Sequence, residues 1–105
     1  MVSSDVIQQM VETIVREFHP VRVILFGSHA RGDAGPDSDV DLLVVLPQAD
    51  DKRKAAIAMR EALDTFPTAK DVIVTTPEEI ARLGHIVGTI LRPALREGKV
   101  LYDRS

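Results

Sequence analysis

The stretch Gly27-Ser28-His29-Ala30-Arg31-Gly32, followed by Ser38-Asp39-Val40-Asp41-Leu42, decides the fold of this 105-residue chain. It lies between two apolar runs. The first run, 21–26, is rich in β-branched residues and predicts a buried strand. The second run, 39–46, predicts another strand, and Asp39 and Asp41 stand at its start. Because successive side chains of a strand point to opposite faces, these two carboxylates are expected to point the same way.

The paired carboxylates indicate a site for a divalent cation. Two acidic side chains on one face repel each other unless a cation lies between them, and magnesium prefers oxygen ligands. The alternative is an acidic turn that is merely solvated, which accounts well for Asp33 and Asp37. It accounts poorly for Asp39 and Asp41, because the strand that they open is apolar on both faces.

The Gly-Ser turn indicates a seat for phosphate. Gly27 permits the close approach of a backbone to a ligand. Ser28 supplies a hydroxyl and a main-chain N–H where a helix is expected to start, and such starts bind anions. A helix N-cap is the simpler role for Ser28, and Arg31 is equally suited to clamp phosphate or to face solvent. His29 lies inside this turn, where contact with nucleotide is the alternative, but it is not a motif position and is expected to be exposed to solvent.

The hydrophobic pattern alternates between helices and strands along the whole chain, which predicts an α/β (α+β) fold. The strands are expected at 21–26, 39–46, 71–75 and 100–102. The helices are expected from Ser3 or Ser4 to the residue before Pro20, in a short segment after Gly27, over 51–66, and from 77 to 97 with a bend or break at Pro93.

The connections predict which strands run together. A crossover helix between strands 39–46 and 71–75 makes these strands parallel. Strand 21–26 must run antiparallel to strand 39–46 if Gly27 is to reach the carboxylates. Asp71 then lies at the same edge of a small mixed sheet as Asp39 and Asp41, and we expect it to be a third metal ligand. The alternative for Asp71 is an ion pair with Lys70 or a neighbouring arginine.

Composition predicts one domain over residues 1–105 and excludes several classes. The net charge of −3 argues against direct nucleic-acid binding. The chain has no cysteine, which excludes disulfides and thiolate metal sites. No apolar run has membrane-spanning length and no signal peptide is recognisable, so a cytoplasmic protein without a membrane partner is expected.

These motifs resemble those of the minimal nucleotidyltransferases, a small group of the DNA polymerase β superfamily that is similar to the catalytic domain of kanamycin nucleotidyltransferase. The family pattern is Gly-Ser, Arg-Gly, Ser-Asp-x-Asp-Leu and a later Asp. The resemblance implies a nucleotidyltransferase fold, with a small mixed sheet flanked by helices. It also implies that Asp39, Asp41 and Asp71 are the catalytic metal ligands, and that nucleotide binds at Gly27, Ser28, Arg31 and Ser38.

The resemblance further implies two Mg²⁺ ions, ATP as the nucleoside triphosphate, and an all-helical partner of the HEPN type. In such toxin–antitoxin pairs the nucleotidyltransferase neutralises the toxin, in some systems by transferring AMP to a tyrosine, and homo- or hetero-oligomers are possible. The alternative is a binding module that blocks its partner sterically. The intact acids favour the enzyme, whereas the lack of an acceptor-binding domain favours the binding module.

Overall fold

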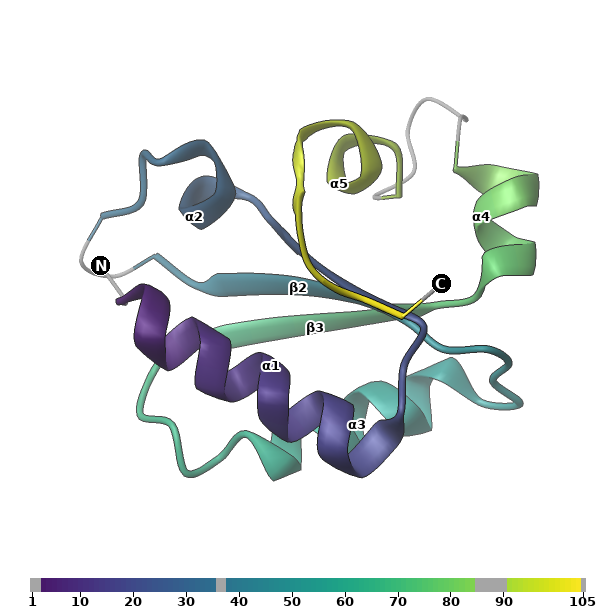
Figure 1. Cartoon of the computed structure of the whole chain (residues 1–105), viewed down its shortest axis with the longest axis horizontal. Coiled ribbons are helices and arrows are strands. Elements are labelled where there is room, and N and C mark those ends of the chain that lie inside the picture. The colour runs from purple at the N-terminus through teal and green to yellow at the C-terminus, as the bar shows by residue number, and fades with distance from the viewer. Residues whose placement is uncertain (1–2, 36–37, 85–90, 105) are drawn as a thin grey trace.

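The computed structural model describes residues 3–35, 38–84 and 91–104 as a four-stranded sheet flanked by helices (Figure 1). The strands are β1 (Arg22–Phe26), β2 (Val40–Val45), β3 (Lys70–Thr75) and β4 (Lys99–Asp103). The helices are α1 (Ser4–Phe18), α2 (Ser28–Arg31), α3 (Lys52–Ala62), α4 (Pro77–Leu83) and α5 (Leu91–Glu97).

The sheet is mixed, as the connections predict, and its strand order is β3-β2-β1-β4. β2 and β3 are parallel, because α3 carries the chain back across the sheet between them. β1 runs antiparallel to both of its neighbours, β2 and β4. The C-terminal end of β1 therefore meets the N-terminal ends of β2 and β3 at one edge, which we call the carboxylate edge.

Two hydrophobic layers hold the sheet between the helices. α1 and α3 cover one face, where Met10 and Ile14 of α1 and Met59 of α3 are fully buried against the strands. Leu91 and Ala94 of α5 pack on the other face against Ile24 and Leu43. Figure 1 shows α1 and α3 on one side of the strands and α5 on the other.

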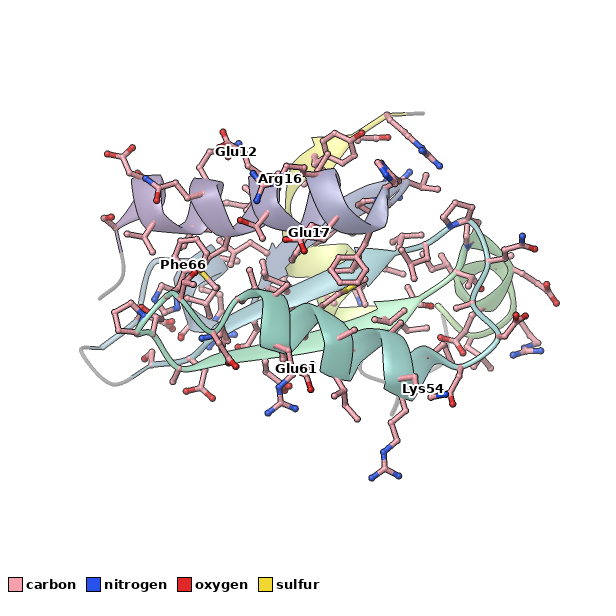
Figure 2. All side chains as sticks on the ribbon, turned by 90° about the horizontal axis from the view of Figure 1, so that it is seen from below. Glu12, Arg16, Glu17, Lys54, Glu61 and Phe66 are labelled. Carbon is pink, nitrogen blue, oxygen red and sulfur yellow. The ribbon has the colours of Figure 1, made fainter. Side chains whose placement is uncertain are left out.

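The outer surface of the α1–α3 layer is charged. Figure 2 looks onto this layer, where the labelled Glu12 and Arg16 belong to α1 and Lys54 and Glu61 belong to α3. All four side chains are exposed. Such a pattern is typical of amphipathic helices that bury a single apolar stripe. No helix in the described part of the chain combines the length and the apolar character needed to cross a lipid bilayer.

The C-terminal helical region differs from the prediction of one helix broken at Pro93. α4 ends at Leu83, with Gly84 as its C-cap, so the predicted helix does not run unbroken to Pro93. Residues 85–90 of that prediction lie outside the described residues, and Pro93 belongs to α5, which is described from Leu91 to Glu97. α3 is also shorter than predicted. It ends at Ala62, before a series of turns that leads to Pro67.

A polar contact network fastens the edge of the sheet opposite to the carboxylate edge. Glu79, on α4, accepts a hydrogen bond of 2.6 Å from the hydroxyl of the fully buried Thr75 at the end of β3. Its other carboxylate oxygen pairs with Lys52, at the start of α3. Burial raises the pKa of Glu79, but the hydrogen bonds from Lys52 and Thr75 outweigh burial and hold the pKa below its ordinary value.

Candidate functional site

Strand register brings two of the predicted carboxylates opposite each other at the carboxylate edge. Asp41 of β2 pairs with Asp71 of the parallel strand β3. On its other side Asp41 pairs with Phe26, the last residue of β1. Asp39 lies just before β2, which begins at Val40 and not at 39 as predicted. The three acids thus come from adjacent segments of the sheet, although 30 residues separate Asp41 from Asp71 in the chain.

Gly27 lies directly against the Asp41 carboxylate. Its backbone has φ 76° and ψ −156°, a combination that is essentially restricted to glycine. A β-carbon at this position would overlap Asp41 Oδ2 and would lie 3.2 Å from its Cγ. The absence of a side chain at Gly27 therefore lets the turn after β1 approach the carboxylate of β2, which joins the two sequence motifs in space.

The electrostatics of the edge centre on Asp41. Burial raises the pKa of its carboxyl, and the negative charges of Asp71 and Asp39 raise it further. His29 and Arg31 act in the opposite direction. The neighbouring negative charges disfavour the ionised form of Asp41. A cation bound beside it would stabilise the carboxylate.

The predicted nucleotide-binding residues lie in the connection between β1 and β2. Ser28 begins α2 directly after Gly27, and its side chain is half-buried. The Ser38 hydroxyl accepts a hydrogen bond of 2.8 Å from the Gly35 N–H. Arg31 is exposed and its Nε lies 3.3 Å from Asp33 Oδ2. The guanidinium is thus on the surface, yet close enough to act on Asp41 through its charge.

Lys70 does not take Asp71 as its partner, contrary to the alternative raised by the sequence. The Lys70 ammonium donates to the carbonyl oxygens of Phe66 at 2.9 Å and Thr68 at 3.1 Å. It thereby ties the turn after α3 to the start of β3. Asp71 itself is exposed at the carboxylate edge.

His29 differs from its prediction, because it is half-buried rather than solvent-exposed. Its Nδ1 lies 2.9 Å from the main-chain oxygen of Asp39, ten residues further along the chain. The sequence offers only a contact with nucleotide as the alternative role of this residue, which is not a motif position. The hydrogen bond was not predictable, because it joins segments whose proximity only the folded sheet establishes.

The donor set fits a hard divalent cation by its chemistry. Three carboxylates supply oxygen ligands, and their mutual repulsion would be relieved by a positive charge. Their side chains are not gathered around one point, however. Over residues 3–35, 38–84 and 91–104, no group of three or more His, Cys, Asp or Glu side chains is arranged to hold a metal ion.

A shallow hollow lies elsewhere, on the outer surface of α3. Ile57, Arg60, Glu61 and Asp64 line it. None of these residues belongs to the carboxylate edge or to the two motifs. The candidate site lies instead at the carboxylate edge, where Asp39 and Asp71 are exposed.

This combination of a mixed sheet, a Gly-Ser turn and strand-borne carboxylates defines a nucleotidyltransferase domain. The family of that description matches residues 7–96, and the chain belongs to it. No curated protein sequence matches the chain.

Solved structures share the fold at low sequence identity. A candidate nucleotidyltransferase from Sulfolobus solfataricus is 22% identical with a TM-score of 0.63, over 95% of this chain and 79% of that chain. A toxin–antitoxin complex with AMP-PNP is 22% identical with a TM-score of 0.56, over 91% and 73% of the two chains. A mutant of the toxin–antitoxin MntA–HpeT with two Asp-to-Glu substitutions is 16% identical with a TM-score of 0.63, over 91% and 72%.

Proposed function

We propose that this chain is a magnesium-dependent nucleotidyltransferase that transfers AMP from ATP to the hydroxyl of a tyrosine on a helical, HEPN-type toxin, and so acts as an antitoxin. The observation that carries the proposal is the register of Asp41 with Asp71, beside a glycine whose backbone touches the Asp41 carboxylate. Membership of the nucleotidyltransferase family supports the reaction class.

Each motif residue has a proposed part in the reaction. Asp39, Asp41 and Asp71 would hold two Mg²⁺ ions, which supply positive charge to the phosphates when bound. The main chain at Gly27 and the Ser28 hydroxyl would hold the β- and γ-phosphates, with Arg31 and Ser38 at the sides.

The proposed transfer is an in-line displacement. The tyrosine oxygen attacks the α-phosphorus of ATP, the bond from that phosphorus to the bridging oxygen breaks, and pyrophosphate leaves. Asp71 would take the proton of the attacking hydroxyl. It is suited to this part because it is exposed, whereas Asp41 is half-buried. Most of the acceleration would come from positioning and from electrostatic stabilisation of the transferred group.

A protein acceptor agrees with the exposure of the site. Asp39 and Asp71 are exposed at the carboxylate edge, so a second protein can reach them. Two structures with the same fold are toxin–antitoxin complexes, one of them with AMP-PNP. In the other, two aspartates are changed to glutamate, so acidic residues were the target of mutation there. We therefore propose that a second protein completes the site in a hetero-oligomer, in the cytoplasm.

The nucleotide half of the proposal is tested by calorimetry with AMP-PNP on the isolated chain. Binding should be much tighter with magnesium than without it. The double variant Asp39→Asn/Asp41→Asn should lose this difference and remain folded. Asp50→Asn is the matched control, because Asp50 is exposed in the loop after β2, at the far end of that strand, and should keep the difference. Equal magnesium-dependent binding by the double variant would exclude the assignment of these carboxylates.

The acceptor half is tested with ATP labelled at the α-phosphate and the helical protein encoded in the adjacent reading frame. Label should appear on that protein, at a tyrosine, only when both proteins and magnesium are present. Ser28→Ala and Asp71→Asn should each suppress labelling while complex formation persists. If a variant with Asn at 39, 41 and 71 still neutralises the toxin fully, neutralisation is steric and the catalytic proposal is wrong.

A further inference from the structure

The hydrogen bond between His29 and Asp39 connects the two halves of the candidate site. His29 lies on α2, two residues after Gly27. Asp39 lies two residues before Asp41, outside β2. Nδ1 of the ring is 2.9 Å from the Asp39 carbonyl oxygen, which is a normal hydrogen-bond distance.

The chemistry of the two atoms settles where the hydrogen lies. A main-chain carbonyl oxygen can only accept a hydrogen bond, so Nδ1 must carry the hydrogen. The neutral ring is then the Nδ1–H tautomer. This hydrogen bond restrains the direction in which the ring points from α2.

The Asp39 carbonyl lies just beyond the ends of both strand ladders. Pairing between β1 and β2 ends at Phe26 and Asp41. Pairing between β2 and β3 begins at Val40, whose N–H donates to the Ala69 carbonyl at 2.9 Å. The His29 ring donates a hydrogen bond to the carbonyl of Asp39, the residue just before β2. The bond thereby connects the residue that precedes the strand to α2.

We propose that His29 is a positioning residue that sets the spacing between the Gly27–Ser28 turn and the carboxylates of Asp39 and Asp41. The role rests on the proposed function, since that spacing matters only if both segments hold one nucleotide. The hydrogen bond of His29 reaches the main chain of Asp39, so its effect passes through the placement of the carboxylates. Comparable outer partners of ligand residues change affinity or activity by about 10- to 100-fold when removed.

Two substitutions separate the hydrogen bond from the bulk of the ring. His29→Asn keeps an N–H donor at nearly the position of Nδ1, whereas His29→Leu keeps a similar volume without a donor. In the presence of magnesium, the leucine variant should bind AMP-PNP about 10-fold more weakly than wild type. The affinity of the asparagine variant for AMP-PNP should stay within about threefold of wild type. A purely steric role of the ring would not restore the affinity in this variant.

A spectroscopic readout on the free protein tests the hydrogen bond without nucleotide. Nitrogen-15 NMR of the imidazole at mildly alkaline pH should report the Nδ1–H tautomer. The carbonyl carbon-13 resonance of Asp39 should move in His29→Leu and stay close to its wild-type position in His29→Asn. Thermal melts of both variants should lie within a few degrees of wild type, because the bond is exposed to solvent.

The outcomes distinguish this inference from the proposed function. If wild type binds AMP-PNP and His29→Leu binds it equally well, the positioning role is wrong while the proposed function stands. The Nε2–H tautomer in the free protein would overturn the positioning role as well. A wild-type chain with no magnesium-dependent binding would overturn the proposed function, and the positioning role with it.

Discussion

Replacing Gly27 with alanine tests the contact that joins the two motifs. The substitution adds one β-carbon, which would overlap Asp41 Oδ2. It also forces a non-glycine residue into the backbone conformation at φ 76° and ψ −156°. Gly32→Ala is a matched control. Gly32 also has a positive φ, of 85°, but a β-carbon there would meet nothing within 4 Å.

The structure gives a magnitude for each variant. A left-handed backbone costs a non-glycine residue about 1–2 kcal/mol, and this is the whole cost expected for Gly32→Ala. At Gly27 the rarer backbone region costs about 1–3 kcal/mol, and the displaced Asp41 side chain adds about 1 kcal/mol. The stiffening of the unfolded chain by alanine is common to both variants and cancels. Gly27→Ala should therefore be less stable than Gly32→Ala by about 1–2 kcal/mol, or roughly 5–10 °C in Tm for a chain of this size.

Thermal and urea unfolding of the two variants measure this difference. The same pair should be made in an Asp41→Ala background, where the nearest remaining Asp41 atom is Cβ, 3.5 Å from the added carbon. The extra cost of Gly27→Ala should then fall by about 1 kcal/mol, as expected for residues in contact. An unchanged cost in that background would refute the close contact between Gly27 and Asp41.

Two further predictions concern charge and use melts over a series of pH values. Burial and the charges of Asp71 and Asp39 raise the pKa of Asp41, so the native state binds this proton more tightly than the unfolded state does. The stability that this proton contributes is present in acid and is lost as pH rises through the raised pKa. Asp41→Asn should thus melt no lower than wild type at neutral pH without metal, and a loss of several degrees would indicate a structural hydrogen bond. The lowered pKa of Glu79 makes stability depend on pH in the opposite direction. The ionised carboxylate stabilises the fold above the ordinary pKa of 4.5, and this stabilisation is lost as pH falls through the lowered pKa. Glu79→Gln should lower the free energy of unfolding by about 1 kcal/mol at neutral pH, and this difference from wild type should become smaller in acid. A difference that does not change with pH would contradict a stabilising role of the ionised Glu79 carboxylate.

Local patterns predict most of the secondary structure. Ser3 caps α1 through a hydrogen bond from the Val6 N–H, and Thr76 caps α4 ahead of Pro77, as short-range signals indicate. Pro93 shows the limit of such signals. A proline is compatible with the first turn of a helix and incompatible with its interior, and the sequence does not say which of these positions it will occupy.

The sequence likewise predicts one part of the candidate site and leaves another part undetermined. The motif spacing and the βαβ connection suffice to predict that Asp41 and Asp71 meet at one sheet edge, because a parallel crossover aligns the starts of two strands. The side-chain chemistry at that edge is not predictable from spacing. Lys70 turns to two carbonyl oxygens and not to Asp71, since the turn after α3 places those acceptors within reach.

By itself, the sequence determined the type of protein. The periodicity of its apolar residues predicts the strands and helices, and the Gly-Ser turn with the Asp-x-Asp pair and the later Asp carries the resemblance to the nucleotidyltransferases. Only the tertiary structure decided the contacts between segments far apart in the chain. The approach of Gly27 to Asp41, the hydrogen bond from His29 to the Asp39 carbonyl, and the ion pair of Glu79 with Lys52 all depend on side-chain directions and strand ends. Those directions are set by packing across the sheet, which no local pattern encodes.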